Sequence, residues 1–119
     1  MAIVGRVNRH KEIIVHFSIV SDEAEHSVEA LLDTGFNGFV ALPDDVVSEH
    51  NLLLLGREKV ILADGSSRIV RKYEARIRFA GKTRRVEVIG AGESLVGMSM
   101  LWMHEVHISC VLDGDVDLV

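Results

Sequence analysis

Apart from the packing of its own side chains, the sequence has few features that could stabilise the chain or anchor it to a membrane. Its single cysteine, Cys110, excludes an internal disulfide and a cysteine-based zinc cage, and it fits a reducing compartment. Its apolar runs are only a few residues long, against the roughly 18 that a membrane-spanning helix needs, and no signal-peptide pattern opens the chain. These absences predict a cytoplasmic protein without membrane contact.

Positive charge is also scarce. Thirteen basic residues face 18 acidic ones, which gives a formal net charge of -5 at pH 7. A nucleic-acid-binding surface normally needs a concentration of basic side chains to meet the phosphate backbone. The charge balance therefore excludes nucleic acid as an expected partner.

What the chain does have is enough apolar content for one packed core. It is 48% hydrophobic over 119 residues, a length typical of one domain. No internal repeat, linker or low-complexity tract interrupts it. The sequence predicts a single domain over residues 1–119.

Period-two alternation of apolar residues recurs along the chain and predicts strands. Val15, Phe17 and Ile19 share one face of such a run. The other expected strands are 28–33, 39–42, 60–62, 68–79, 83–90, 106–112 and 116–119. Pro43 followed by two acidic residues predicts a helix to about Asn51, and residues 97–103 predict a second short helix. The fold class is all-β, mainly strands with one or two short helices.

The turn after one expected strand is the main candidate for chemistry. Apolar residues lead into Asp33, Thr34 and Gly35, so a buried strand delivers a carboxylate into a Gly-rich loop. Alone, such an Asp is most often a turn former. A second feature is the Asp-Gly pair within Ala63, Asp64, Gly65 and Ser66, which predicts a projecting hairpin.

Together these motifs resemble the retropepsin-like aspartic proteases, in particular single-domain prokaryotic members whose turn reads Asp-Thr-Gly-Phe. The resemblance spans about residues 12–112 and includes Asp33-Thr34-Gly35, the Leu42-Pro43 helix start, the 63–66 hairpin and Leu95-Val96-Gly97 before a short helix. It implies a closed, β-barrel-like acid protease fold with a single lobe.

The resemblance also implies an activity. Asp33 would be the catalytic residue, Thr34 and Gly35 would support its turn, and residues 63–66 would form a flap over an extended peptide or protein substrate. Aspartic proteases use two carboxyls, so one Asp-Thr-Gly per chain implies a homodimer. No cofactor and no metal is expected.

Two residues depart from the viral relatives. Phe36 stands where those proteins have a small residue, so we expect its ring to narrow or reshape the cleft. Met98 stands where they have an arginine, so any dimer contact made by that arginine is missing. We also expect the apolar end of the chain, 116–119, to leave a strand edge that dimerisation covers.

Two other functions remain open. The first is a catalytically silent peptide- or protein-binding module with the same fold, and the second is an unrelated small β-barrel ligand-binding protein, for which a monomer would be evidence. His104 and His107 miss the spacing of zinc-protease ligands and are expected at the surface. Cys110, within an apolar run, is expected to be buried.

Overall fold

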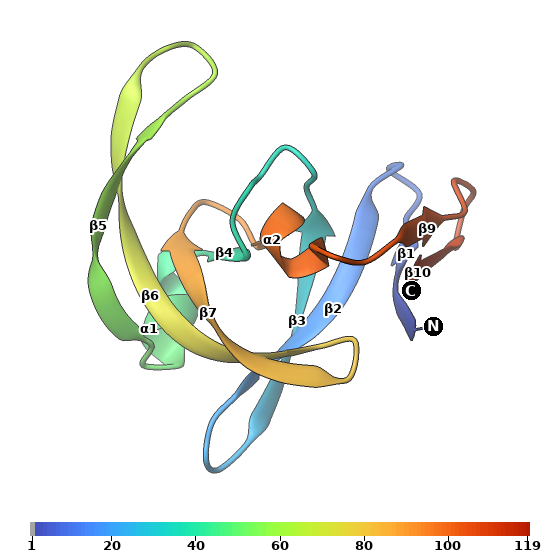
Figure 1. Ribbon diagram of the computed structural model, residues 1–119, viewed down its shortest axis with the longest axis horizontal. Helices are drawn as coiled ribbons and strands as arrows, with labels where there is room; N and C mark the ends of the chain where they lie inside the picture. Colours follow the sequence, from blue (N-terminus) through green and yellow to red (C-terminus); the bar gives the residue numbers. More distant parts are fainter. Residues whose placement is uncertain (1) are drawn as a thin grey trace.

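A computed structural model describes residues 2–119 as ten strands and two short helices (Figure 1). In chain order they are β1 (Ala2–Val7), β2 (Ile13–Val20), β3 (Glu25–Leu32), β4 (Val40–Leu42), α1 (Asp44–Glu49), β5 (Leu53–Ile61), β6 (Ser67–Phe79), β7 (Lys82–Gly90), β8 (Leu95–Val96), α2 (Met98–Leu101), β9 (Val106–Ile108) and β10 (Asp115–Leu118). The predicted class, mainly β with one or two short helices, is confirmed.

The ten strands form one sheet that closes on itself in part. Their order is β5-β6-β7-β4-β8-β3-β2-β1-β10-β9, and β2 pairs in addition with β6. That extra contact covers two residue pairs, Ser18 with Arg78 and Ile19 with Ile77. It closes a ring of six strands from β2 through β8 to β6. β5 on one side and β1, β10 and β9 on the other extend beyond the ring.

The core fills this ring with the apolar faces that the alternation predicted. Val15, Phe17 and Ile19 of β2 are at most 3% exposed. The long strand β6 buries every second residue from Tyr73 to Phe79 in the same way. The short helix α1 adds Val47 to this core. The alternation therefore identifies the strand faces that form the core, and this core supports the candidate site.

Several predicted boundaries were wrong. β5 begins at Leu53, not near residue 60, and the helix α1 ends at Glu49, not near Asn51. The predicted strand 106–112 ends at Ile108, and residues 109–114 form a loop in which Gly114 N–H donates to Val111 O (2.9 Å). Cys110 lies in this loop and is exposed, so the prediction that it is buried was also wrong.

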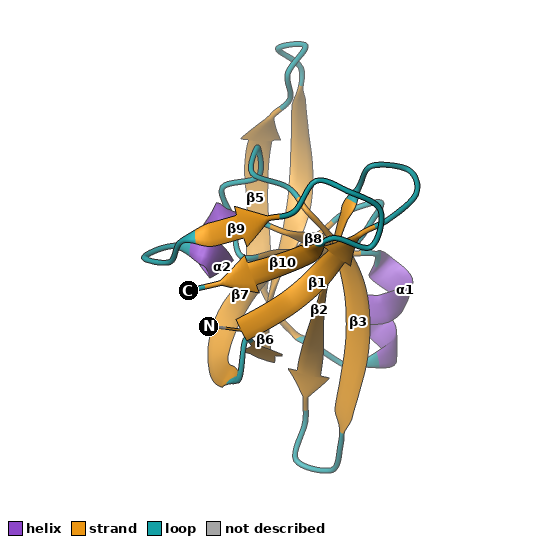
Figure 2. Cartoon of the chain, turned by 90° about the vertical axis from the view of Figure 1, so that its right-hand side faces the viewer, coloured by secondary structure: helices purple, strands orange, loops and turns teal. Residues whose placement is uncertain are grey.

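The end of the chain does not form the predicted open edge. β10 lies between β1 and β9 and pairs with both in antiparallel fashion (Figure 2). Its residues Val116 and Leu118 are buried in the core. Glu105 and Val119 also exchange two backbone hydrogen bonds, of 3.2 and 2.9 Å. The C-terminal strand is thus paired on both sides within one chain, and in the described sheet the outer strands are β5 and β9.

Candidate functional site

Asp33 lies where the sequence predicted it, directly after β3. Its backbone N–H donates to Val96 O (2.9 Å), and its carbonyl accepts from the Phe36 N–H (3.1 Å). Its carboxylate Oδ1 accepts a hydrogen bond from the Gly35 N–H (2.9 Å). The side chain is half-buried while Thr34 and Gly35 are exposed. The turn therefore holds one carboxylate oxygen in a fixed direction at the end of β3.

The strand β8, which contains the Leu95-Val96 pair of the resemblance, lies between β3 and β4, the two strands that flank the Asp33 loop. β8 pairs in parallel with β3, Leu32 opposite Val96, and in antiparallel fashion with β4, Val40 opposite Val96. The two strands that flank the loop, β3 and β4, are thus joined through β8. This arrangement fixes the two ends of the loop that carries Asp33, because each arm shares its ladder with β8.

The start of α2 is joined to the same loop by hydrogen bonds. The Met98 N–H donates to Phe36 O (2.8 Å), and the Gly97 N–H donates to Phe39 O (2.9 Å). The Ser99 hydroxyl donates to Asn37 O (2.6 Å). These bonds satisfy loop carbonyls that would otherwise face away from any ladder partner. The loop is therefore held by α2 as well as by β8.

The Phe36 ring packs inward on this loop. A Cβ added at Gly97 would lie 2.6 Å from Phe36 Cδ2 and 2.4 Å from Gly38 O. A Cβ added at Gly38 would lie 2.6 Å from Phe36 Cζ. The half-buried ring therefore covers two glycines, and the expectation that it narrows or reshapes the cleft stays a prediction.

Arg84 on β7 contacts both the end of the Asp33 loop and α2. Its guanidinium lies 5.5 Å from the centroid of the Phe39 ring, and Nη2 donates to Met100 O (3.2 Å). The Arg84 side chain is nevertheless exposed to solvent. Its contacts with Phe39 and α2 join residues far apart in the sequence, so no local pattern indicates them.

The predicted hairpin is formed by β5 and β6, and residues 63–66 make its tip. The Gly65 N–H donates to Leu62 O (2.9 Å), with Gly65 at φ +85°. Asp64 Oδ1 accepts from the Ser66 hydroxyl (2.5 Å) and the Ser66 N–H (2.9 Å). These two hydrogen bonds hold the pKa of the Asp64 carboxyl below its ordinary value. The hairpin and the Asp33 loop project to the same side of the molecule (Figure 1).

The hairpin also exposes an unusual amount of apolar surface. The large apolar side chains that it exposes are Leu53, Leu54, Leu55, Ile61, Leu62 and Ile69. Single exposed apolar residues are ordinary on protein surfaces, but a gathering on one projecting element is typical of a binding surface. These apolar side chains of the hairpin are therefore exposed and are not part of the core of this chain.

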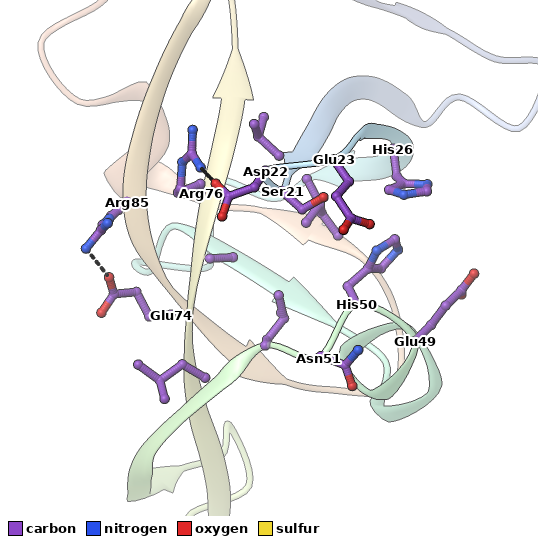
Figure 3. Close-up of a pocket in the computed structure, with 15 residues that line it drawn as sticks. Ser21, Asp22, Glu23, His26, Glu49, His50, Asn51, Glu74, Arg76 and Arg85 are labelled. Carbon is purple, nitrogen blue, oxygen red and sulfur yellow. Dashed lines mark hydrogen bonds and ion pairs between the residues drawn. The ribbon is translucent and has the colours of Figure 1, made fainter.

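A separate polar cavity of about 640 Å³ lies beside the β2–β3 turn, the end of α1 and β6 (Figure 3). Two of its charged pairs are already formed, Asp22 with Arg76 (3.3 Å) and Glu74 with Arg85 (3.8 Å). The His26 and His50 rings lie next to each other there, with 4.7 Å between centroids and 57° between ring planes. None of the predicted site residues lines this cavity, so it is distinct from the Asp33 loop.

The rest of the described chain offers no competing metal centre. Within residues 2–119 no group of three or more His, Cys, Asp or Glu side chains is placed to hold a metal ion. His104 and His107 are exposed, as predicted. None of the helices described for these residues is long and apolar enough to cross a membrane.

Comparison with known proteins adds no assignment, since no protein-family model matches the chain and no curated protein matches its sequence. What bears on function is the chemistry that the residues at the Asp33 loop make available. A carboxylate fixed by a backbone N–H, on a loop held by β8 and α2, can orient a water or accept its proton.

Proposed function

We propose that this protein is an aspartic endopeptidase that acts as a homodimer, with one Asp33 from each subunit. The observation that carries the proposal is the Asp33 turn itself, in which Gly35 fixes the carboxylate while β8 passes between the arms of the loop. The resemblance to the retropepsin-like aspartic proteases implies that this turn carries the catalytic carboxylate.

The proposed chemistry requires two carboxyls in contact. One, ionised, takes a proton from water as the water attacks the scissile carbonyl, and the other, protonated, donates to the carbonyl oxygen. Two adjacent carboxylates cannot both stay charged, so the pair shares one proton. The chain has one Asp-Thr-Gly, and a second subunit is therefore needed to supply the partner of Asp33.

The proposed substrate is an extended peptide, or an extended segment of a protein, held between the Asp33 loop and the β5–β6 hairpin. The apolar side chains of the hairpin, including Ile61 and Ile69, are suited to contact apolar substrate side chains. Closure of the tip would exclude water from the reacting carbonyl. The proposed compartment is the cytoplasm, and the single cysteine, which fits a reducing environment, supports it.

The test compares the wild-type protein with Asp33→Asn on a mixed peptide library, with mass spectrometry as the readout. Asparagine keeps an oxygen that can accept from the Gly35 N–H, so the turn is preserved while the proton transfer is lost. We expect the variant to cleave at least about 1,000-fold more slowly, because removal of a residue that acts in proton transfer typically costs this much. Equal cleavage by both proteins contradicts the proposal, and peptide binding by both without cleavage favours the binding module.

A further inference from the structure

The chain exposes a second apolar surface next to the Asp33 turn. A cleft of about 490 Å³ opens between the Thr34 side of that turn, α2 and β9. Met98 and Ile108 line it. Trp102 and Met103 also line it, and 68% and 89% of their respective surfaces are exposed. Met103 also has a positive φ of 70°, which is uncommon for a residue with a side chain.

The charge of the cleft suits contact between identical molecules. Two copies of a chain with a net charge of -5 repel each other. None of the cleft residues is Asp, Glu, Lys or Arg, and His104 is its one ionisable group. When two copies dock through this surface, no carboxylate of one cleft therefore lies against the same carboxylate of the other copy.

The paired state of β10 excludes a simpler route to a dimer. An obvious way to join two small β domains is to add the terminal strand of one to the sheet of the other. Here β10 already pairs with β1 and β9, so its backbone groups are satisfied within one chain. A second copy must meet this chain on some other surface.

Position relative to Asp33 selects the cleft as that surface. Thr34, which lines it, directly follows Asp33 in the exposed turn. A two-fold axis that brings two Asp33 carboxyls together therefore passes beside Thr34 and brings the two clefts close to each other. The inference rests on the proposed two-subunit site, and it deepens that proposal by naming the contact surface.

We propose that the cleft between α2 and β9 is the docking surface for a second copy of this chain. Trp102 and Met103 of each copy pack against the cleft of the other. The flexible methionine fills an irregular gap, and the tryptophan supplies a large apolar area at little entropic cost. This contact encloses the paired Asp33 turns on the Thr34 side.

The test uses Met103→Glu, with Ile3→Glu as the matched control. Both residues are exposed and apolar, but Ile3 lies on β1, outside the cleft. Sedimentation equilibrium gives the dimer dissociation constant, and far-UV circular dichroism confirms that both variants are folded. We expect Met103→Glu to weaken the dimer at least about 100-fold, since it buries an unpaired charge, and Ile3→Glu to leave it unchanged.

Trp102 provides an independent readout, because it is the only tryptophan in the chain. Its emission should shift to shorter wavelength as the wild-type protein dimerises, and should stay at long wavelength in Met103→Glu. A wild-type dimer that Met103→Glu does not weaken, with unchanged Trp102 emission, overturns the inference and leaves the proposed protease intact. A wild-type monomer at every concentration overturns both. A monomer whose Trp102 emission shifts when a pepstatin-like peptide binds identifies the cleft as a peptide site instead.

Discussion

Gly97 occupies a position where any side chain would separate α2 from the Asp33 loop. An added Cβ would meet the carbonyl oxygen of Gly38 at 2.4 Å, and a backbone atom cannot move aside as a flexible side chain can. We expect Gly97→Ala to destabilise the protein by at least about 2 kcal/mol, the cost of forcing extra volume into a packed site. It should also abolish any cleavage, because the loop that orients Asp33 must shift.

Gly92→Ala is the control for this prediction, since a Cβ at Gly92 meets nothing within 4 Å. Its stability should stay within about 0.5 kcal/mol of the wild type. Urea unfolding measures both variants. Equal stability of the two variants would show that the Asp33 loop does not contact α2 through Gly97.

A pH-dependent change is expected at Asp64. Its pKa in the folded hairpin lies below the unfolded value, because Ser66 donates two hydrogen bonds to the carboxylate. The ionised carboxylate therefore stabilises the folded hairpin tip at pH values above the pKa of Asp64 in the unfolded chain. This stabilisation is lost as the pH falls through the lowered pKa of the folded state. The Ser66 amide resonance should report the loss on acidification. The transition should be absent in Asp64→Asn, which keeps an acceptor oxygen but does not titrate.

At the scale of elements, the β5–β6 hairpin should be the least protected part of the sheet. Almost all of β5 and the first half of β6 are exposed, whereas β6 from Tyr73 onward alternates into the core. Hydrogen exchange should be fast at residues 62–66 and slow from Tyr73 to Phe79. A pepstatin-like peptide should slow exchange at the tip and leave Tyr73–Phe79 unchanged. Identical tip exchange with and without the peptide would remove the flap assignment.

Elements with one buried and one exposed face were predictable from the sequence. β2 and the buried half of β6 follow the alternation because each faces the core on one side only. β5 extends earlier than predicted because its side chains are exposed on both faces, so no alternation marks its start. Cys110 was misplaced because a local apolar run does not reveal that Gly114 turns back on Val111.

The candidate site divides in the same way. The Asp33 turn and the 63–66 tip depend on neighbouring residues, and the sequence predicted their positions. The inward packing of Phe36 on Gly97 and the contacts of Arg84 join segments that are distant in the sequence. Such contacts are decided by the tertiary fold, which the local pattern does not contain.

At the scale of the whole molecule, the C-terminal strand β10 pairs within the sheet of its own chain. Val116 is fully buried between β1 and β9, while Val119, three residues later, is half exposed. Val116→Ala should cost about 1–3 kcal/mol in the free energy of unfolding, from lost burial and the cavity left behind. Val119→Ala should change it by less than about 0.5 kcal/mol. Thermal unfolding of both variants checks this difference, and similar melting temperatures would contradict it.

The pairing of Ala2 with Leu118 places the two chain ends on adjacent strands. Neighbouring strands lie only about 5 Å apart, so a linker of a few residues could join the ends without disturbing β1 or β10. New ends could then be opened at the exposed Gly81 between β6 and β7. We expect this circular permutant to fold, since loop tips tolerate such cuts, and to keep the order of strands around the ring while changing their order along the chain.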